Sequence, residues 1–511
     1  MIRASSGNIQ GPLLTSSVLS DWLAQRLARD GASPIYRQLH HLLQQAILLH
    51  TLTPGSKLPS SRLLADELAI ARNTVTNVYE QLALEGYVRT LRGSGTYVVD
   101  NTADEIVGRD ERAGLATASS AAAEHRGSLL SARGQRLIST AGASNRQWGA
   151  FMPGVPDVTT FPARVWSRLQ NRYWRRPQAE LMTYSTGGGY GPLRQTLADY
   201  LRTARSVRCA PEQIIITTGI HQSVDLAVRL LADVGDVVWT EDPCYWGMRS
   251  VLQSSGLQMR PIPVDAEGLN PSAADLAEPP KLILVTPSHQ YPLGMVMSLA
   301  RRRMLLEYAR RTKSWIIEDD YDSEFRYASR PLASLQGLDT AGQVIYVGSF
   351  GKILYPGLRI GYLVVPEALA GKFAIALAEL YREGQGVQQA VLADFIEQGH
   401  FTSHIRRMRN AYGMRRQLLM DAIANRLGEP LPVLGDEAGL HLVARLPDTA
   451  NDQLIMREAL AAGIATRALS TYFSDPAQAP RGLLLGYACV PDQEIGPSFG
   501  TLANVIERYL G

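Results

Sequence analysis

One lysine near the middle of the chain has the surroundings of a reactive amine. Lysine is scarce in these 511 residues, and Lys352 stands in the segment Ser349-Phe350-Gly351-Lys352, directly after the apolar run 344–347. Arg359 follows seven residues later. Desolvation or a neighbouring cation lowers the pKa of a lysine, which an amine needs to form a Schiff base with an aldehyde. Because a cation also suits a phosphate, the pair indicates a site for a phosphorylated aldehyde, pyridoxal 5′-phosphate (PLP).

Three side chains upstream fit the ring of this cofactor. Asp319 and Tyr321 follow the strand-like run 315–318. An ionised aspartate keeps the pyridinium nitrogen protonated, and a tyrosine hydroxyl can bond the ring O3′. Tyr245 follows another strand-like run and is predicted to stack on the ring. The segment Thr218-Gly219-Ile220-His221-Gln222 lies between a strand and an apolar helix, so the backbone N–H groups of Gly219, Ile220 and His221 are predicted to bind the phosphate.

These residues need a scaffold of strands and helices, and the pattern after residue 146 supplies one. Strand-like runs at 214–218, 237–240, 282–286, 315–318 and 344–348 alternate with helical stretches, which predicts an α/β fold with a mainly parallel sheet. Residues 101–146 are rich in Ala, Ser, Thr, Gly and Arg and are predicted to be a linker. The expected domains are therefore 18–100, the linker 101–146, and 147–511.

The N-terminal domain has the pattern of a helix-turn-helix. An apolar helical period over 35–47 is followed by two short segments, for which Ser60 and Asn73 are the expected N-caps. Arg72, Thr74 and Asn77 open the second segment, the predicted recognition helix that enters the major groove. Ser60 and Arg62 open the preceding one and are expected to contact phosphates.

A β-rich stretch at 87–99 with a Gly-Ser-Gly turn follows these helices and predicts a wing. Arg92, Gly93 and Gly95 would let the wing backbone approach a DNA duplex closely. The alternative is a small helical domain that binds protein, but two capped helices and a wing in one register favour DNA.

Composition excludes several other classes of protein. No apolar run is long enough to span a membrane and no secretory leader is evident, so a cytoplasmic protein is expected. Three scattered cysteines give no disulfide framework and no metal spacing. The net charge is only +3, so any affinity for DNA must come from the placement of charges.

The motifs together resemble a known family. Residues 34–99 resemble the winged-helix domains of the GntR superfamily, and residues 150–511 resemble the fold type I, aminotransferase-like PLP proteins. Fused in this order, they resemble the MocR/GabR regulators. The resemblance implies that Lys352 forms the Schiff base, Asp319 binds the ring nitrogen, Tyr321 binds O3′ and Tyr245 stacks. It also assigns the phosphate to Ser349 with Arg359, and implies a head-to-tail homodimer in which Tyr184 reaches the neighbouring subunit's phosphate.

The chain departs from working aminotransferases at two places. Gln290-Tyr291-Pro292-Leu293-Gly294 replaces the usual Asn-Pro-x-Gly, which leaves His289 as a candidate for the second O3′ partner. Leu484 stands where aminotransferases carry the arginine that holds the substrate carboxylate, with Arg467 and Arg481 as possible substitutes.

These observations favour a regulator over an enzyme. The interpretation is a promoter-binding transcription regulator whose PLP domain senses a metabolite, either an amino compound or PLP itself as in PdxR-like members. Leu484 favours PLP. The alternative is an aminotransferase with an accessory DNA-binding domain. A PLP-binding scaffold without a DNA role is disfavoured by the wing.

Overall fold

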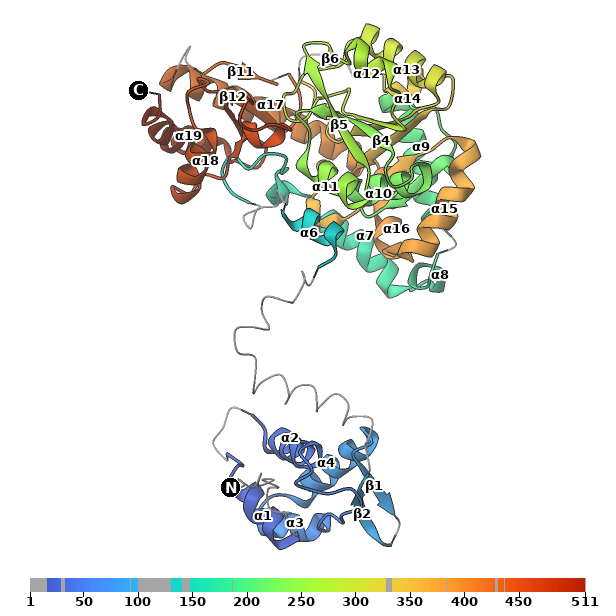
Figure 1. The fold of residues 1–511 in the computed structure, drawn as a ribbon, viewed down its shortest axis with the longest axis vertical. Helices are drawn as coiled ribbons and strands as arrows, with labels where there is room; N and C mark the ends of the chain where they lie inside the picture. Colours follow the sequence, from blue (N-terminus) through green and yellow to red (C-terminus); the bar gives the residue numbers. More distant parts are fainter. Residues whose placement is uncertain are drawn as a thin grey trace, which may run out of the picture. The chain divides into compact units, whose positions relative to one another are not determined.

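The chain folds into two compact units, residues 1–129 and 130–511 (Figure 1). The computed structural model describes residues 16–28, 33–91, 93–99, 130–139, 148–185, 187–327, 333–382, 384–427, 431–435 and 437–510. Each unit has a hydrophobic core of its own.

The described part of the first unit is a winged helix-turn-helix. Its elements are α1 (Ser16–Ala24), α2 (Ile35–Leu48), α3 (Ser61–Leu68), α4 (Arg72–Leu84), β1 (Val88–Leu91) and β2 (Gly95–Val98). The apolar side chains of α2 recur at helical spacing and are buried against α4. Strands β1 and β2 pair antiparallel as the wing. The prediction of two short helices followed by a wing is confirmed.

Two features of this unit differ from the prediction: the N-cap residue of α4 and the presence of α1. The N-cap residue of α3 is as predicted. Ser60 does cap α3, because its Oγ accepts the Leu63 N–H at 3.1 Å. Asn73 does not cap α4, which begins one residue earlier with Ala71 at the N-cap position and no side-chain cap. Helix α1, which packs against α3, was not predicted.

The second unit is built around a mixed, mostly parallel sheet. The strand order is β3-β10-β9-β8-β7-β4-β5-β6. Neighbours from β9 to β5 are parallel, whereas β10 runs antiparallel to β3 and β9, and β6 runs antiparallel to β5. The strands are β3 (Ile214–Thr217), β4 (Val237–Asp242), β5 (Gln258–Asp265), β6 (Gly268–Leu269), β7 (Leu282–Val285), β8 (Trp315–Asp320), β9 (Val344–Ser349) and β10 (Gly361–Val364).

Helices cover both faces of this sheet. Leu282 and Leu284 of β7 join one buried cluster, while Ile283 and Val285 join another, so successive side chains point to opposite covered faces. The helices are α6 (Ala132–Ser139), α7 (Ala163–Arg175), α8 (Ala179–Met182), α9 (Gly191–Arg205), α10 (Ile220–Leu231), α11 (Trp246–Ser254), α12 (Ala273–Ala277), α13 (Leu299–Thr312), α14 (Leu335–Leu338), α15 (Glu367–Tyr381), α16 (Gly386–Glu397), α17 (His400–Arg426), α18 (Asp452–Ala461) and α19 (Asp492–Glu507).

A small antiparallel sheet completes the second unit near the C-terminus. Its order is β11-β12-β14-β13, from β11 (Val433–Leu434), β12 (His441–Arg445), β13 (Arg467–Ala468) and β14 (Gly482–Gly486). Helix α18 packs on β13 and β14, and α19 packs on α17 and α18. The five predicted strands are confirmed, whereas β5, β6 and β10 of the main sheet were not predicted.

Helix α6 lies inside the segment that composition predicted to be linker. It packs against α11 of the second unit (Figure 1). A single apolar pair, Leu137 and Ile138, meets α11 near Trp246. So short a stretch of apolar residues gives no sustained period in the sequence, because the helix depends on its tertiary contact.

Candidate cofactor and DNA sites

The reactive lysine lies at the carboxyl end of the central strand β9. Lys352 is half-buried, and its Nζ donates a hydrogen bond to the Gly154 carbonyl at 2.7 Å. Burial lowers the pKa of Lys352, while the carboxylates of Asp322 and Asp319 act in the opposite direction. The amine is thus placed and desolvated as a Schiff-base lysine requires.

Asp319 is the penultimate residue of the neighbouring strand β8, and its carboxyl group is open to hydrogen bonds from a ligand. Its side chain is buried, and no hydrogen bond to its carboxylate is found among the residues that the structure describes. Burial, then the charges of Asp320 and Asp322, raise the pKa of Asp319 from 3.8 to about 8. A buried carboxyl group without a protein partner fits the protonated ring nitrogen of PLP, which would supply the missing opposite charge.

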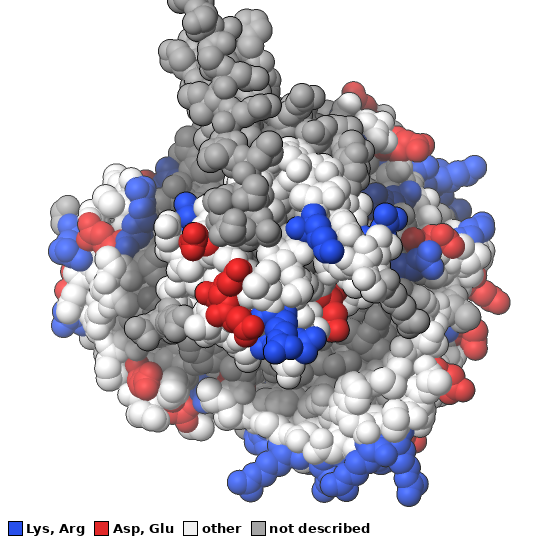
Figure 2. Space-filling model, turned by 90° about the horizontal axis from the view of Figure 1, so that it is seen from below, with Lys and Arg blue, Asp and Glu red and all other residues white. Residues whose placement is uncertain are grey.

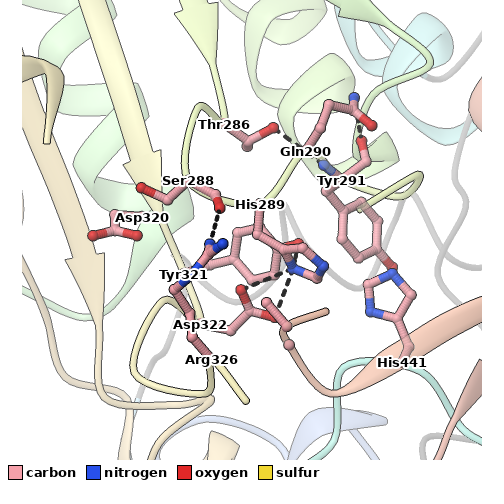
Figure 3. Close-up of polar contacts among 12 residues, drawn as sticks. Thr286, Ser288, His289, Gln290, Tyr291, Asp320, Tyr321, Asp322, Arg326 and His441 are labelled. Carbon is pink, nitrogen blue, oxygen red and sulfur yellow. Dashed lines mark hydrogen bonds and ion pairs between the residues drawn. The ribbon is translucent and has the colours of Figure 1, made fainter. Parts of the chain in front are cut away.

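Tyr321 is held by a buried histidine and aspartate (Figure 3). Its Oη lies 2.9 Å from His289 Nδ1, and the same nitrogen lies 3.1 Å from Asp322 Oδ1. Gly439 covers the histidine so closely that a Cβ there would stand 2.2 Å from His289 Cε1. The geometry places His289 where it orients the Tyr321 hydroxyl. That His289 bonds O3′ directly stays a prediction.

Aromatic rings form one wall beside these groups. Tyr245 is the N-cap residue of α11, and its ring centroid lies 5.6 Å from that of Tyr291. Tyr291 in turn lies 5.6 Å from Tyr321 and 5.6 Å from Tyr472. Burial raises the pKa of Tyr245, so its hydroxyl stays neutral. Tyr245 therefore belongs to the same row of aromatic rings as Tyr321.

The groups that are predicted to bind the phosphate lie together at the start of α10. Gly219 is the N-cap residue, and Ile220 and His221 form the first turn, although the Gly219 N–H already donates to Thr217 Oγ1 at 3.3 Å. The Nη1 of Arg359 comes within 3.9 Å of the position of a Cβ on Gly219. Burial, then the charges of Arg359 and Lys352, lower the pKa of His221. A helix N-terminus with two nearby cations suits a dianionic phosphate.

Ser349 and Tyr184 have different settings. The Oγ of Ser349, at the end of β9, accepts the Gly351 N–H at 3.1 Å, which leaves the hydroxyl hydrogen available to a phosphate. Tyr184 is 73% exposed, and the Arg382 guanidinium lies 5.7 Å from its ring centroid. Tyr184 is therefore not drawn into its own chain's site.

Leu484 lies in an apolar cluster next to the aromatic wall. It is fully buried with Val443 and Leu469, and Tyr291 packs against this cluster. Arg467 lies opposite Leu484 in the β13–β14 pair, and its charge acts on the Tyr291 hydroxyl. Arg481 instead donates to the carbonyls of Pro476 and Ala477, which is a structural role.

The predicted DNA-reading side chains share one exposed region of the first unit. Arg72 and Asn77 are exposed on α4, and Thr74 is half-buried on its first turn. Arg62 is exposed on α3. The Nε of Arg72 donates to Ser61 Oγ at 3.5 Å, so α3 and α4 are linked at their first turns.

Lys57, which precedes α3 and bridges to Tyr97 of β2, lies against the wing and was not among the predicted DNA-binding residues. Gly95 has φ of +124°, and a Cβ there would stand 2.6 Å from Lys57 Cε, so a side chain at this position would displace the lysine. Lys57 Nζ also lies 5.8 Å from the ring centroid of Tyr97. Gly93, with φ of +77°, forms the turn, whereas Arg92 lies outside the described residues.

Sequence reasoning also missed two partners of the cofactor residues. Asp322 and Gly154 contact His289 and Lys352 from distant parts of the chain. The dense run of acids at 318–324 after a buried strand was the available signal for Asp322. In the described part of the chain no helix is long and apolar enough to cross a membrane, and no group of side chains is suited to a metal ion.

Comparison with known proteins identifies the class of each unit. Residues 157–476 match the model of aminotransferase class I and II, and residues 35–98 match that of bacterial regulatory proteins of the gntR family. A multiple substrate aminotransferase from Thermococcus profundus superimposes with a TM-score of 0.65 at 26% identity, over 75% of this chain and 98% of that one. The molecule is thus a gntR-family DNA-binding domain fused to an aminotransferase-like domain that binds PLP.

Relatives that contain both units define the family. The chain is 38% identical over 483 residues to the probable rhizopine catabolism regulatory protein MocR of Rhizobium meliloti, covering 94% of this chain and 95% of MocR. It is 32% identical over 451 residues to the pyridoxine biosynthesis transcriptional regulator PdxR of Corynebacterium glutamicum, covering 88% and 91%. The chain belongs to the MocR-type, PLP-domain transcription regulators, and the predicted fold class, cofactor and regulatory function are confirmed.

Proposed function

We propose that the chain controls transcription by coupling occupancy of its PLP site to its affinity for promoter DNA, without efficient transamination. The observation that supports this proposal is that the residues for the cofactor are present, whereas the position of the arginine for a substrate carboxylate is occupied by Leu484. Lys352, Asp319 and Tyr321 are arranged to hold PLP, whereas Leu484 lies in a buried apolar cluster against which Tyr291 packs. An amino acid substrate needs a guanidinium for its carboxylate, and Leu484 supplies none.

The proposed roles of the site residues follow from their positions. Lys352 bonds the cofactor aldehyde, Asp319 faces the ring nitrogen, and Tyr321 binds O3′ with His289 behind it. The first turn of α10 with Ser349 and Arg359 holds the phosphate. PLP supplies an aldehyde that reacts with amines and a ring that withdraws electrons.

We further propose that the effector is PLP itself. The apolar Leu484 disfavours an amino acid. One relative that shares most of the chain is named for pyridoxine biosynthesis, which supports a response to the vitamin-derived cofactor. An amino compound without a carboxylate remains the second choice of effector.

Helix α6 offers a route from the cofactor to the linker. Leu137 and Ile138 of α6 face Trp246 of α11 and His221 of the phosphate loop across a small hollow of about 310 Å³. Tyr245, the proposed stacking residue, caps the same helix α11. Contacts of Tyr245 and His221 with bound PLP would therefore change the surface on which α6 rests, and α6 is the first described helix of the second unit.

A homodimer is part of the proposal. Around Tyr184 the large apolar side chains Met182, Ile375 and Leu380 are at least half exposed. The loop that carries Gly187 packs onto α15 at Ala374, which gathers these side chains near one another. Exposed apolar surface of this kind marks an interface, and Tyr184 would then reach the second subunit.

A specific observation favours a second candidate, a working aminotransferase. Arg467 acts electrostatically on the hydroxyls of Tyr291 and Tyr472, so it lies near the aromatic wall. An amino acid carboxylate held by Arg467 would restore the missing anchor.

Two measurements separate the candidates. Operator duplexes selected from a random pool by the full chain are titrated with cofactor-free and PLP-loaded protein. The absorption spectrum of bound PLP is then followed across a panel of amino acids. The regulator proposal expects different operator affinities and slow conversion of PLP to its amine form. Identical titrations together with rapid conversion by any amino donor would establish the aminotransferase instead.

The α6 route has its own variant. Ile138→Asp places a charge in the hollow between α6 and α11, and we expect it to keep the PLP spectrum while losing the effect of PLP on operator affinity. Leu460→Asp, a substitution of an exposed apolar residue on α18, is the matched control. An unchanged PLP effect in Ile138→Asp would eliminate α6 as the route.

A further inference from the structure

Helix α7 of the PLP-binding unit carries an unusual run of positive charge. The stretch from Phe161 to Gln178 contains five arginines and no acidic residue. The helix buries Trp166 and Leu169 and turns its arginines outward. These side chains are Arg164, Arg168, Arg172, Arg175 and Arg176, all exposed.

The arginines line an open groove of about 970 Å³. Its remaining lining comes from Ala163, Ser167, Leu169, Asn171 and Gln398, so both polar and apolar side chains stand beside the arginines. Arg172 pairs with Asp394 of α16. For Arg164, Arg168 and Arg175, no acidic partner is found in the described ranges. We call this set of residues the arginine groove.

The groove is too basic to be explained by the general charge of the molecule. On the face drawn in Figure 2, several groups of Lys and Arg lie beside groups of Asp and Glu, in keeping with the net charge of +3. Holding several arginines together costs repulsion, which a bound polyanion would remove.

The spacing of the arginines suits a chain of phosphates. Arg164, Arg168 and Arg175 follow one another at intervals of four and seven residues, so their backbone positions are separated by about 6 Å and about 10 Å along the helix axis. Arginine binds phosphate oxygens with two parallel N–H donors, which lysine does not. A row of such groups in an open groove fits an extended phosphate backbone better than a single small anion.

We propose that the arginine groove binds the sugar-phosphate backbone of DNA that flanks the operator. The proposal rests on DNA binding by the winged helix, which brings a duplex to the same molecule. Residues 100–129 separate the last described residue of the wing from the second unit, and a chain of that length spans at most about 100 Å, or some 30 base pairs. The duplex is therefore the polyanion held at highest local concentration near the groove.

Such a contact would be independent of sequence. It adds affinity only when the duplex extends beyond the operator, and it makes that added affinity sensitive to salt, because each phosphate contact releases counterions. The winged helix would recognise the operator sequence, and the arginine groove would increase the affinity for duplexes that extend beyond the operator.

The test uses the full chain and a duplex selected from a random pool, with flanks of about 5 or about 30 base pairs. For the unmodified chain we expect a slope of log affinity against log salt that is steeper by about two to three on the long duplex. The triple variant Arg164→Gln/Arg168→Gln/Arg175→Gln should lose this difference and keep its affinity for the short duplex.

A matched control removes the same charge from exposed positions elsewhere on the unit. Arg208→Gln/Arg303→Gln/Lys313→Gln should keep the flank effect. Retention of the bound-PLP spectrum shows that each variant is folded. If the triple variant is not folded, the single variant Arg168→Glu replaces it, because a single substitution at an exposed position leaves the buried side of the helix intact.

Several outcomes would overturn the proposal. These are an unchanged flank effect in the triple variant, an equal loss in the control, or a change in oligomeric mass with the flank effect intact, which would make the groove an interface between copies. Loss of binding to the short duplex as well would place the failure in the winged helix, and would refute a separate role for the groove.

Discussion

Replacing Asp319 by asparagine should reduce the pH dependence of stability in the cofactor-free protein, to which the raised pKa values of Glu241, Glu318 and Glu324 also contribute. Burial and the neighbouring acids raise the pKa of Asp319 from 3.8 to about 8 in the folded chain. The folded state therefore keeps a proton that the unfolded chain has already lost between these values. This contribution to stability is complete below about pH 4, falls as pH rises, and is fully lost above about pH 8.

The size of the effect follows from the shift. One pKa unit corresponds to about 1.4 kcal/mol, so the whole shift sets an upper limit of about 6 kcal/mol. Rearrangement around Asp320 and Asp322 will reduce it, and we expect about 2–4 kcal/mol of lost stability between pH 5 and pH 8. An asparagine side chain cannot ionise, so the Asp319→Asn variant should lose the Asp319 contribution and keep the slope that the three buried glutamates supply. Bound PLP should flatten the slope of the unmodified chain as well, because a protonated ring nitrogen compensates the carboxylate.

Urea unfolding between pH 5 and pH 9 measures this slope. Six of the seven tryptophans lie after residue 130, so intrinsic fluorescence reports on the PLP-binding unit. Asp448→Asn, which removes a charge from an exposed side chain, is the control and should retain the slope of the unmodified chain. Equal slopes in the unmodified chain and in Asp319→Asn would refute the assignment of the raised pKa to this carboxyl group.

The Asp319→Asn variant should also bind PLP at least tenfold more weakly by absorbance titration, which corresponds to a loss of about 1.4 kcal/mol in binding free energy.

Three further substitutions test the two sites. Lys352→Ala should remain folded by circular dichroism and lose the visible absorption of the bound cofactor; an unchanged spectrum would remove this lysine from the site. Arg72→Ala should reduce the preference for operator over random DNA by about 1–3 kcal/mol, whereas Arg62→Ala should weaken both and flatten the salt dependence. Equal losses on both DNAs for Arg72→Ala would assign it to phosphates. Ser60→Ala removes the cap on the Leu63 N–H and should destabilise the first unit by about 1 kcal/mol in thermal unfolding, and an unchanged midpoint would contradict the cap.

The sequence was most informative where a reactive or charged side chain lies at or just after the end of a strand. Lys352 and Asp319 were predictable because each ends a short apolar run, and parallel strands bring such ends to one edge of the sheet. Gly154 and Asp322 were not, because each meets its partner across a long stretch of chain. Asn73 was misassigned because Ala71 takes the N-cap position with backbone geometry alone, which no side-chain preference reveals.

Coupling between cofactor and DNA should be sought outside the residues that bond PLP. A ligand shifts an equilibrium only by the difference in its affinity for the two states. That difference must arise at residues that touch the cofactor on one side and a movable element on the other. Lys352 and Asp319 lie at the ends of central strands, which a packed sheet holds in place. Helix α11 differs, because Tyr245 at its start faces the site while Trp246 meets α6, the first helix after the linker. In such a regulator, the residues on the sheet would keep the cofactor chemistry unchanged. The response to the cofactor could then evolve separately through helix α11.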